Sequence, residues 1–125
     1  MAREILFKAK RKDNGEWVEG LPAIFWEEYY MFNPNDKNMA YGIDIDTLCQ
    51  YTGLTDKNGN KIWEHDIIKC GIKMYVFWDE HFASWCLTRK GWLYKHFFGE
   101  SQEPEDCEVI GNIFDNPELL EDEHG

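Results

Sequence analysis

The sequence lacks several features that are common in enzymes and membrane proteins. No stretch approaches the ~20 apolar residues of a membrane helix, and no apolar signal segment opens the chain. The ten glycines stand apart at turns and form neither a phosphate-binding loop nor a dinucleotide fingerprint. Serine occurs only at Ser84 and Ser101, outside any Gly-x-Ser-x-Gly elbow. We therefore expect a cytoplasmic protein that is not bound to membranes and has no serine-nucleophile chemistry.

Cysteine is present but lacks the spacing of metal or redox motifs. The four residues are Cys49, Cys70, Cys86 and Cys107, and no two stand closer than sixteen positions. Each lies in or beside an apolar run, where free cysteine behaves as a small hydrophobic residue. Thiols stay reduced in the cytosol. We therefore expect four free thiols.

Positive charge is missing from the C-terminal quarter. Residues 96–125 contain ten acidic residues and no Lys or Arg, whereas residues 1–95 contain 13 basic and 14 acidic residues. The net charge of −11 is therefore concentrated at this end. Acidic segments are repelled by phosphate backbones and anionic membranes, so we expect no direct nucleic-acid binding. A solvated surface is the favoured reading, and imitation of DNA to block a DNA-binding protein is an alternative.

Aromatic residues are abundant. Six Trp, six Tyr and eight Phe make up 16% of the chain, and each aromatic residue buries roughly 150–250 Å². A core of this size cannot hide them all, and Trp and Tyr are favoured at protein interfaces. The excess predicts a homo-oligomer, and another protein is a further possible partner. The candidate surface tryptophans are Trp26, Trp63, Trp78, Trp85 and Trp92.

Turn residues recur about every eight to twelve positions, the spacing of a β-rich domain. Lys12 to Gly15 and Asp56 to Gly59 are predicted hairpin turns. Gly20 and Pro22 are expected to interrupt the second strand, and residues 33–38 form a predicted loop. Asn116, Pro117 and Glu118 predict a short C-terminal helical turn. We expect one domain, residues 1–125, with a frayed acidic tail at 121–125. The predicted strands are 4–10, 17–18, 24–32, 42–46, 48–51, 62–63, 67–69, 73–78, 83–88, 92–98 and 107–114.

The most regular pattern runs from Gln50 to Ile68. Its glycines allow tight turns, and its Asp and Asn side chains can bond to the amides of their own turn. Gly111 within an apolar strand predicts a bulge or a close backbone approach. The positions with a predicted structural role are Gln50, Tyr51, Thr52, Gly53, Leu54, Asp56, Asn58, Gly59, Trp63, Glu64, Asp66, Gly111, Asn112, Asn116 and Pro117.

Two carboxylate pairs have the spacing of neighbours on one strand face, Glu64 with Asp66 and Asp44 with Asp46. Metal sites need further ligands and a second shell, and the sequence identifies neither. Bonding to backbone N–H groups is the favoured role, and a metal-dependent hydrolase using Glu64 and Asp66 is the alternative. His81 and His96 lie among aromatic residues and are expected to be partly buried polar groups. We expect no catalytic residue, metal or cofactor.

Five segments carry a resemblance: residues 3–9, 17–20, 50–68, 76–80 and 108–119. Through them the chain resembles the YopX family of small phage and prophage proteins. The family usually has Glu-Gly-Asp where this chain has Glu64-His65-Asp66, so His65 implies either a relaxed turn or a mildly strained left-handed residue. The resemblance implies a mainly β fold of several coiled antiparallel sheets, including a small SH3-like barrel, that forms a homo-oligomer. It implies no reaction. The favoured hypothesis is therefore a non-catalytic phage accessory protein that acts by binding another protein, of the host or of the phage.

Overall fold

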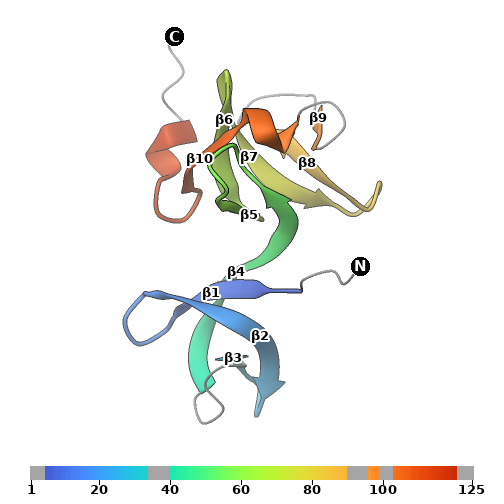
Figure 1. Cartoon of the computed structure of the whole chain (residues 1–125). Coiled ribbons are helices and arrows are strands. Elements are labelled where there is room, and N and C mark those ends of the chain that lie inside the picture. Colours follow the sequence, from blue (N-terminus) through green and yellow to red (C-terminus); the bar gives the residue numbers. More distant parts are fainter. Residues whose placement is uncertain (1–4, 34–39, 90–95, 99–102, 121–125) are drawn as a thin grey trace. The chain divides into compact units, whose positions relative to one another are not determined.

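The computed structural model describes residues 5–33, 40–89, 96–98 and 103–120. Within them the chain forms antiparallel strands and two 3-10 turns, and no helix there could cross a membrane. The prediction of a mainly β fold is confirmed. Two compact units divide the chain, an N-terminal unit of residues 1–51 and a C-terminal unit of residues 52–125 (Figure 1). Strand β4, Ala40–Thr55, contributes residues to both.

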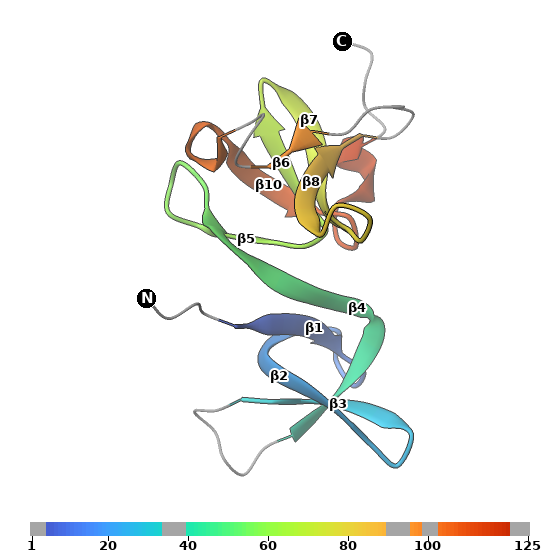
Figure 2. The ribbon, with the colours of Figure 1, turned by 90° about the vertical axis from the view of Figure 1, so that its right-hand side faces the viewer.

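The N-terminal unit is a ring of four strands (Figure 2). Strands β1 (Phe7–Arg11), β2 (Trp17–Phe25) and β3 (Glu28–Phe32) pair in sequence and lead to β4. A further antiparallel pairing of β1 with β4 closes the ring. The resemblance implied an SH3-like barrel, and the structure shows this closed ring. Its core cluster contains the fully buried side chains Ala9, Met31 and Ile43.

Strand β2 is longer than the sequence predicts, because Gly20 and Pro22 do not interrupt it. Pro22 is paired with Met31 inside the β2–β3 ladder. Gly20 has φ 157°, and a Cβ at this position would overlap the carbonyl oxygen of Phe32. The glycine therefore serves a close approach of two backbones, a known reason for glycine within a strand.

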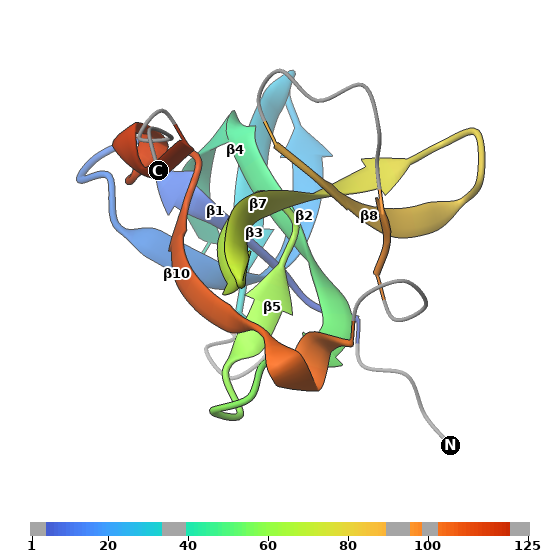
Figure 3. The same cartoon turned by 90° about the horizontal axis from the view of Figure 1, so that it is seen from above.

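The C-terminal unit contains a second sheet, with strand order β10-β6-β7-β8-β9. Figure 3 labels its strands β7, β8 and β10. Its core includes Ile62, Ile68, Val76, Trp85 and Leu87. The last element, η2 (Pro117–Leu120), lies against β7 and confirms the predicted C-terminal helical turn. The other elements are β5 (Lys61–Trp63), which pairs with β4, β6 (Asp66–Cys70), β7 (Ile72–Asp79), β8 (Ser84–Thr88), β9 (His96–Phe97), η1 (Pro104–Asp106) and β10 (Glu108–Asn112).

Some predicted features lie outside the described residues. They are most of the 33–38 loop, positions 92–95 of the predicted aromatic strand and the acidic tail at 121–125. Ser101 and Trp92 belong to the same group.

The expectation of four free thiols is wrong, because Cys70 and Cys107 form a disulfide. Strand β10 pairs with β6 through Glu108 and Lys69, so the next pair in the register brings the two cysteines face to face. Their Cα atoms are 4.5 Å apart, within the range that a disulfide spans. The partners are 37 residues apart in sequence, so only the strand pairing reveals them. Cys49 and Cys86 are buried and do not take part in this disulfide.

Reduction of this disulfide should weaken the fold. Closing a loop of 37 residues restricts the unfolded chain by about 4 kcal/mol in the chain-entropy model, and measured effects are roughly 2–4 kcal/mol. Urea unfolding with and without dithiothreitol measures the difference. A Cys70→Ser, Cys107→Ser double variant should be insensitive to the reductant, and Cys86→Ser should keep the wild-type response. Four titratable thiols in the unreduced, denatured protein would contradict the disulfide.

Candidate functional site

Strands β2, β3 and β4 of the N-terminal unit carry an apolar surface. In the ladder Leu21 pairs with Phe32, and Phe32 pairs with Ala40, so all three side chains point to one face. The neighbouring Met31 is fully buried and points to the core, on the opposite face. We call the residues of these three strands that point away from the core the outer face, which includes Leu21, Ala23, Phe25, Glu28, Tyr30, Phe32 and Ala40.

The composition of the outer face is unusual for a solvated sheet. A sheet with one face on a core normally places polar residues on the other face. Here Leu21, Phe25 and Phe32 are exposed, at 47%, 59% and 44% of their surface. Burial of large apolar side chains is favourable by roughly 1.5–3 kcal/mol each, so this face gains stability when it is covered.

The hairpin that joins β2 to β3 turns on two bulky residues. Phe25 pairs with Glu28, which leaves Trp26 and Glu27 as a two-residue loop. Both have positive φ, 55° and 65°, the pattern of a type I′ turn that normally selects Asn and Gly. Such backbone strain costs on the order of 1–3 kcal/mol per residue and is found mainly at functional sites. The Trp26 side chain is 85% exposed, so the strained turn presents an indole to solvent.

An open apolar groove lies on the outer face beside this turn. Phe25, Tyr30, Phe32 and Ala40 line it, and its volume is about 360 Å³. This is at the lower end of the range for ligand pockets, roughly 300–1,000 Å³. The groove therefore suits one large apolar side chain better than an extended ligand.

The Glu28 carboxylate, which lies on the outer face opposite Phe25, is paired with Lys12. Glu28 accepts a 2.9 Å hydrogen bond from the Lys12 ammonium, and both side chains are exposed. This hydrogen bond raises the pKa of Lys12. The pair reduces the net charge beside the outer face.

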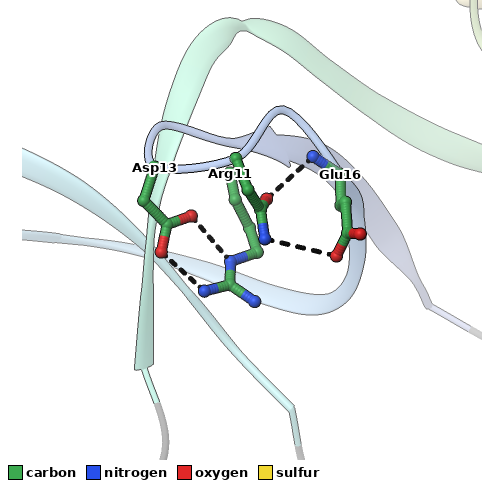
Figure 4. Close-up of polar contacts among 4 residues, drawn as sticks. Arg11, Asp13 and Glu16 are labelled. Carbon is green, nitrogen blue, oxygen red and sulfur yellow. Dashed lines mark hydrogen bonds and ion pairs between the residues drawn. The ribbon is translucent and has the colours of Figure 1, made fainter.

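The β1–β2 turn is built on Arg11 (Figure 4). Its guanidinium donates to both carboxylate oxygens of Asp13, at 3.0 and 2.6 Å, and its backbone N–H donates to the carbonyl of Glu16. The hydrogen bond from Arg11 lowers the pKa of Asp13. The guanidinium also lies over the ring of Tyr41, 4.4 Å from its centroid. Gly15 supplies the positive φ, 73°, that the predicted turn needs.

We call the regular segment from Gln50 to Ile68 the central signature. The Asp56 carboxylate organises the part of it that lies in the C-terminal unit. One oxygen accepts from the backbone N–H groups of Asn58 and Asn60, at 2.9 and 2.8 Å, as predicted for this turn. The other accepts from the Asn60 side chain and from the backbone of Val109, 53 residues away, at 3.0 Å. Burial by itself raises the pKa of Asp56, but the hydrogen bonds outweigh it and lower the pKa. Asp56 thus joins its own turn to strand β10.

The two acids of the Glu64-His65-Asp66 corner have different surroundings. Asp66 is buried and accepts a 2.8 Å hydrogen bond from the backbone N–H of Trp63, the backbone role that the sequence predicts. Glu64 is half-buried and lies 3.7 Å from the imidazole Nε2 of His65.

His65 stands where the family pattern has glycine, and its φ is 73°. Its N–H donates to the carbonyl of Val76, and its carbonyl accepts from Ile113. The ring packs edge-on against Phe114, with centroids 5.4 Å apart. The corner is therefore a left-handed residue held between β7 and the segment after β10.

Residues 108–119, which we call the C-terminal signature, also have a structural explanation. The register of β10 shifts between Val109 and Gly111, which confirms the predicted bulge. A Cβ at Gly111 would collide with the side chain of Asn116, whose Oδ1 accepts from the backbone of Asn112 at 3.2 Å. Asn112 in turn caps Phe114 through its Oδ1 at 2.9 Å.

The remaining signature residues have structural surroundings. The Tyr51 N–H donates to the Leu6 carbonyl, and the Thr52 hydroxyl donates to Ile62 at 2.7 Å. Other positions are Gln50 opposite Phe7, Gly53 with φ 88°, Leu54 packed against the C-terminal core, Asn58 and Gly59 in the turn after β4, Trp63 buried at the end of β5 and Pro117 at the start of η2.

For the alternative function, a metal-dependent hydrolase, the described part of the chain contains no assembled set of metal ligands. No three or more His, Cys, Asp or Glu side chains gather there in a way that could hold a metal ion. In the second carboxylate pair, Asp44 accepts from the backbone N–H of Asp46 at 3.1 Å. His81 is exposed and packs edge-on against Phe82, and His96 belongs to β9.

The candidate tryptophans separate by exposure. Trp63 and Trp85 are buried, and Trp78 is partly exposed and packs edge-on against Trp85. Trp26 is by far the most exposed of the candidates that the structure describes. Sequence reasoning named Trp26 but missed Leu21, Phe25 and Phe32. The sequence did contain a signal for this face. Between residues 21 and 32, apolar residues occur at both the odd-numbered and the even-numbered positions, and not only at one of the two sets.

A comparison with protein-family models gives one assignment. The model described as YopX protein matches residues 3–121, which is nearly the whole chain. This confirms the resemblance drawn from the sequence. No curated protein matches the chain.

The Asp56→Asn variant should be less stable at neutral pH, by roughly 1.5–3 kcal/mol, because hydrogen bonds to a charged group are replaced. The pKa of Asp56 is lowered in the folded state. Its contribution is therefore present above the unfolded pKa of about 3.9 and is lost as the pH falls through the folded value. Urea unfolding from pH 7 to pH 2.5 should show the two proteins converging in acid. Asp46→Asn, at an exposed position, is the control, and a pH-independent difference would contradict this account.

His65→Gly should be more stable than His65→Ala by about 1 kcal/mol. Both variants lose the ring contact with Phe114, and they differ in the Cβ, which is unfavourable at positive φ. Chemical unfolding of the pair measures the difference. Equal stabilities, or a more stable alanine variant, would show that the corner is not strained.

Proposed function

Because the chain belongs to the YopX family of phage-type proteins, we propose that it is a non-catalytic phage accessory protein that self-assembles and binds protein through the outer face. The observation that carries the proposal is the apolar outer face of β2, β3 and β4. Exposed apolar patches of this kind mark interaction sites in folded proteins. The carboxylates of the central signature support a non-catalytic role, since Asp56 and Asp66 bond to backbone N–H groups.

The distribution of charge supports assembly through the N-terminal unit. Residues 1–51 contain six basic and nine acidic side chains, a net charge of −3, whereas residues 52–125 contain seven basic and fifteen acidic ones, a net charge of −8. Two copies repel each other least when they meet through the N-terminal unit. The same acidic excess disfavours a nucleic acid as the partner.

The test is the mass in solution of a matched pair of variants. The wild type should scatter light as an oligomer at micromolar concentration. Leu21→Ser with Phe25→Ser should shift it toward the 14.9 kDa monomer, with the dissociation constant raised at least about tenfold, because central apolar residues dominate interface energies. The control is Ile72→Ser, an exposed apolar residue of the C-terminal unit, which should leave the mass unchanged. A monomeric wild type would refute self-assembly.

A further inference from the structure

The half of strand β2 that pairs with β3 has a second edge, which no strand of the described residues covers. Strand β1 pairs with β2 up to Gly20, which lies opposite Phe7. Strand β3 pairs with β2 from Leu21 to Phe25, on the other side of β2. Residues 5 and 6, which precede β1, do not belong to a strand. We call the side of Leu21 to Phe25 that continues from β1 the open edge.

The hydrogen-bonding pattern of the hairpin identifies the backbone groups on the open edge. Phe25 and Glu28 enclose a two-residue turn, and such a closing pair exchanges hydrogen bonds. Bonded and non-bonded pairs alternate along an antiparallel ladder, so Ile24 and Tyr29 form a pair without mutual hydrogen bonds. The N–H and C=O groups of Ile24 therefore point away from β3, to the open edge.

Proline at position 22 fits this assignment. Proline has no backbone N–H, so within sheets it is tolerated where that group would not join a neighbouring strand. Pro22 lies opposite Met31, two residues before Ile24, so its nitrogen and its carbonyl are also on the open edge. The open edge thus presents one donor, the Ile24 N–H, and two acceptors, the carbonyls of Pro22 and Ile24.

The side chains along the open edge are apolar. Natural edge strands are commonly protected from other strands by charged side chains, and the segment from Leu21 to Phe25 contains none. Pro22 removes a single donor. The side chains of Leu21, Ile24 and Phe25 are 47%, 65% and 59% exposed. Leu21 and Phe25 lie on the outer face and Ile24 points to the opposite face, so an added strand meets apolar groups on both sides of the sheet.

The charges at the end of this segment favour a basic partner. Glu27 and Glu28 follow Phe25 directly, and the side chain of Glu27 is exposed. Glu28 is paired with Lys12, so Glu27 provides the negative charge at the turn. The whole chain has a net charge of −11. Complementary charge guides the encounter of two proteins and suppresses wrong partners. A segment with Lys or Arg beside apolar residues is therefore complementary to this edge.

We propose that the open edge binds an extended, basic segment of another protein as an added antiparallel strand. The added strand lies in line with β1, accepts a hydrogen bond from the Ile24 N–H and donates to the carbonyls of Pro22 and Ile24. Strand addition of this kind draws its affinity from main-chain hydrogen bonds and its specificity from alternate side chains. The inference rests on the proposed function, because it names the chemistry of the protein partner and its mode of binding beside the outer face.

Peptide selection supplies a probe of defined sequence. A phage-displayed library of random short linear peptides is selected on the full wild-type chain, and the most enriched peptide is synthesised. We expect apolar residues at every second position, with Lys or Arg near one end. Apolar residues with the helical spacing i, i+3 and i+4 would overturn the proposal, as would a selection that enriches no peptide.

Two substitutions at one position isolate the backbone donor. Ile24→Pro and Ile24→Ala both remove the isoleucine side chain, but only Ile24→Pro removes the N–H on the open edge. The hairpin keeps its hydrogen bonds in both variants, because this N–H does not join β2 to β3. Fluorescence anisotropy with the synthetic peptide should show binding at least about tenfold weaker for Ile24→Pro than for Ile24→Ala. Equal affinities would contradict the proposal.

Methylation of the peptide backbone tests the same contact on the unaltered protein. Each amide nitrogen of the synthetic peptide is methylated in turn. In an added strand, alternate amides face β2 and the intervening amides face solvent. Methylation of the first set should weaken binding at least about tenfold, and methylation of the second set should leave it nearly unchanged. A scan without this alternation would overturn strand addition.

The outcomes separate this inference from the proposed function. A peptide that loses affinity for Leu21→Ser with Phe25→Ser, but shows no alternation in the methylation scan, would overturn strand addition and leave protein binding at the outer face. A wild-type oligomer that Ile24→Pro dissociates, with no peptide enriched, would show that a second copy occupies the edge and would overturn the proposed partner. A monomeric wild type that binds the peptide with alternation would remove self-assembly and support the added strand.

Discussion

The narrow interior of the four-stranded ring is the constraint from which the rest of the N-terminal unit follows. Small closed sheets have space for only a few side chains, and here Ala9, Met31 and Ile43 form the buried core cluster. Phe25, Tyr30 and Phe32 lie on the outer face, and Trp26 lies at the hairpin tip. The exposed face is thus a consequence of closure as well as of composition.

The C-terminal unit meets its structural demands differently. It has a larger core that includes Trp85 and Phe98, and its last strand is attached by groups distant in sequence. The Asp56 carboxylate binds Val109, and Cys107 is linked to Cys70. A buried charge with several hydrogen bonds and a covalent link both fix strand β10 in one register. The central and C-terminal signatures are regular because their residues make these contacts.

The sequence was sufficient to predict the strands and turns that depend on residues close together in the chain. Alternating patterns and turn residues located most strands, and Asp56, Gly59 and Gly111 have the predicted turn and bulge roles. Three features could not be derived, because each depends on distant strands. The Cys70–Cys107 bond needs the β6–β10 pairing, the glycine at position 20 serves the end of β3, and the outer face needs the β2–β3–β4 register. The Trp26-Glu27 turn was missed because its residues lack the usual turn chemistry.

The closure of the ring by β1 and β4 also determines the order in which the chain can fold. Phe7 pairs with Gln50, a contact across more than forty residues, whereas β2 and β3 are joined by two residues. Local hairpins form in microseconds, and distant pairings wait for loop closure. During synthesis the β2–β3 hairpin therefore leaves the ribosome before its closing strand exists. During that interval both apolar faces of the hairpin are exposed to solvent. Chains that are being translated from the same messenger RNA therefore present the same exposed apolar surface to each other.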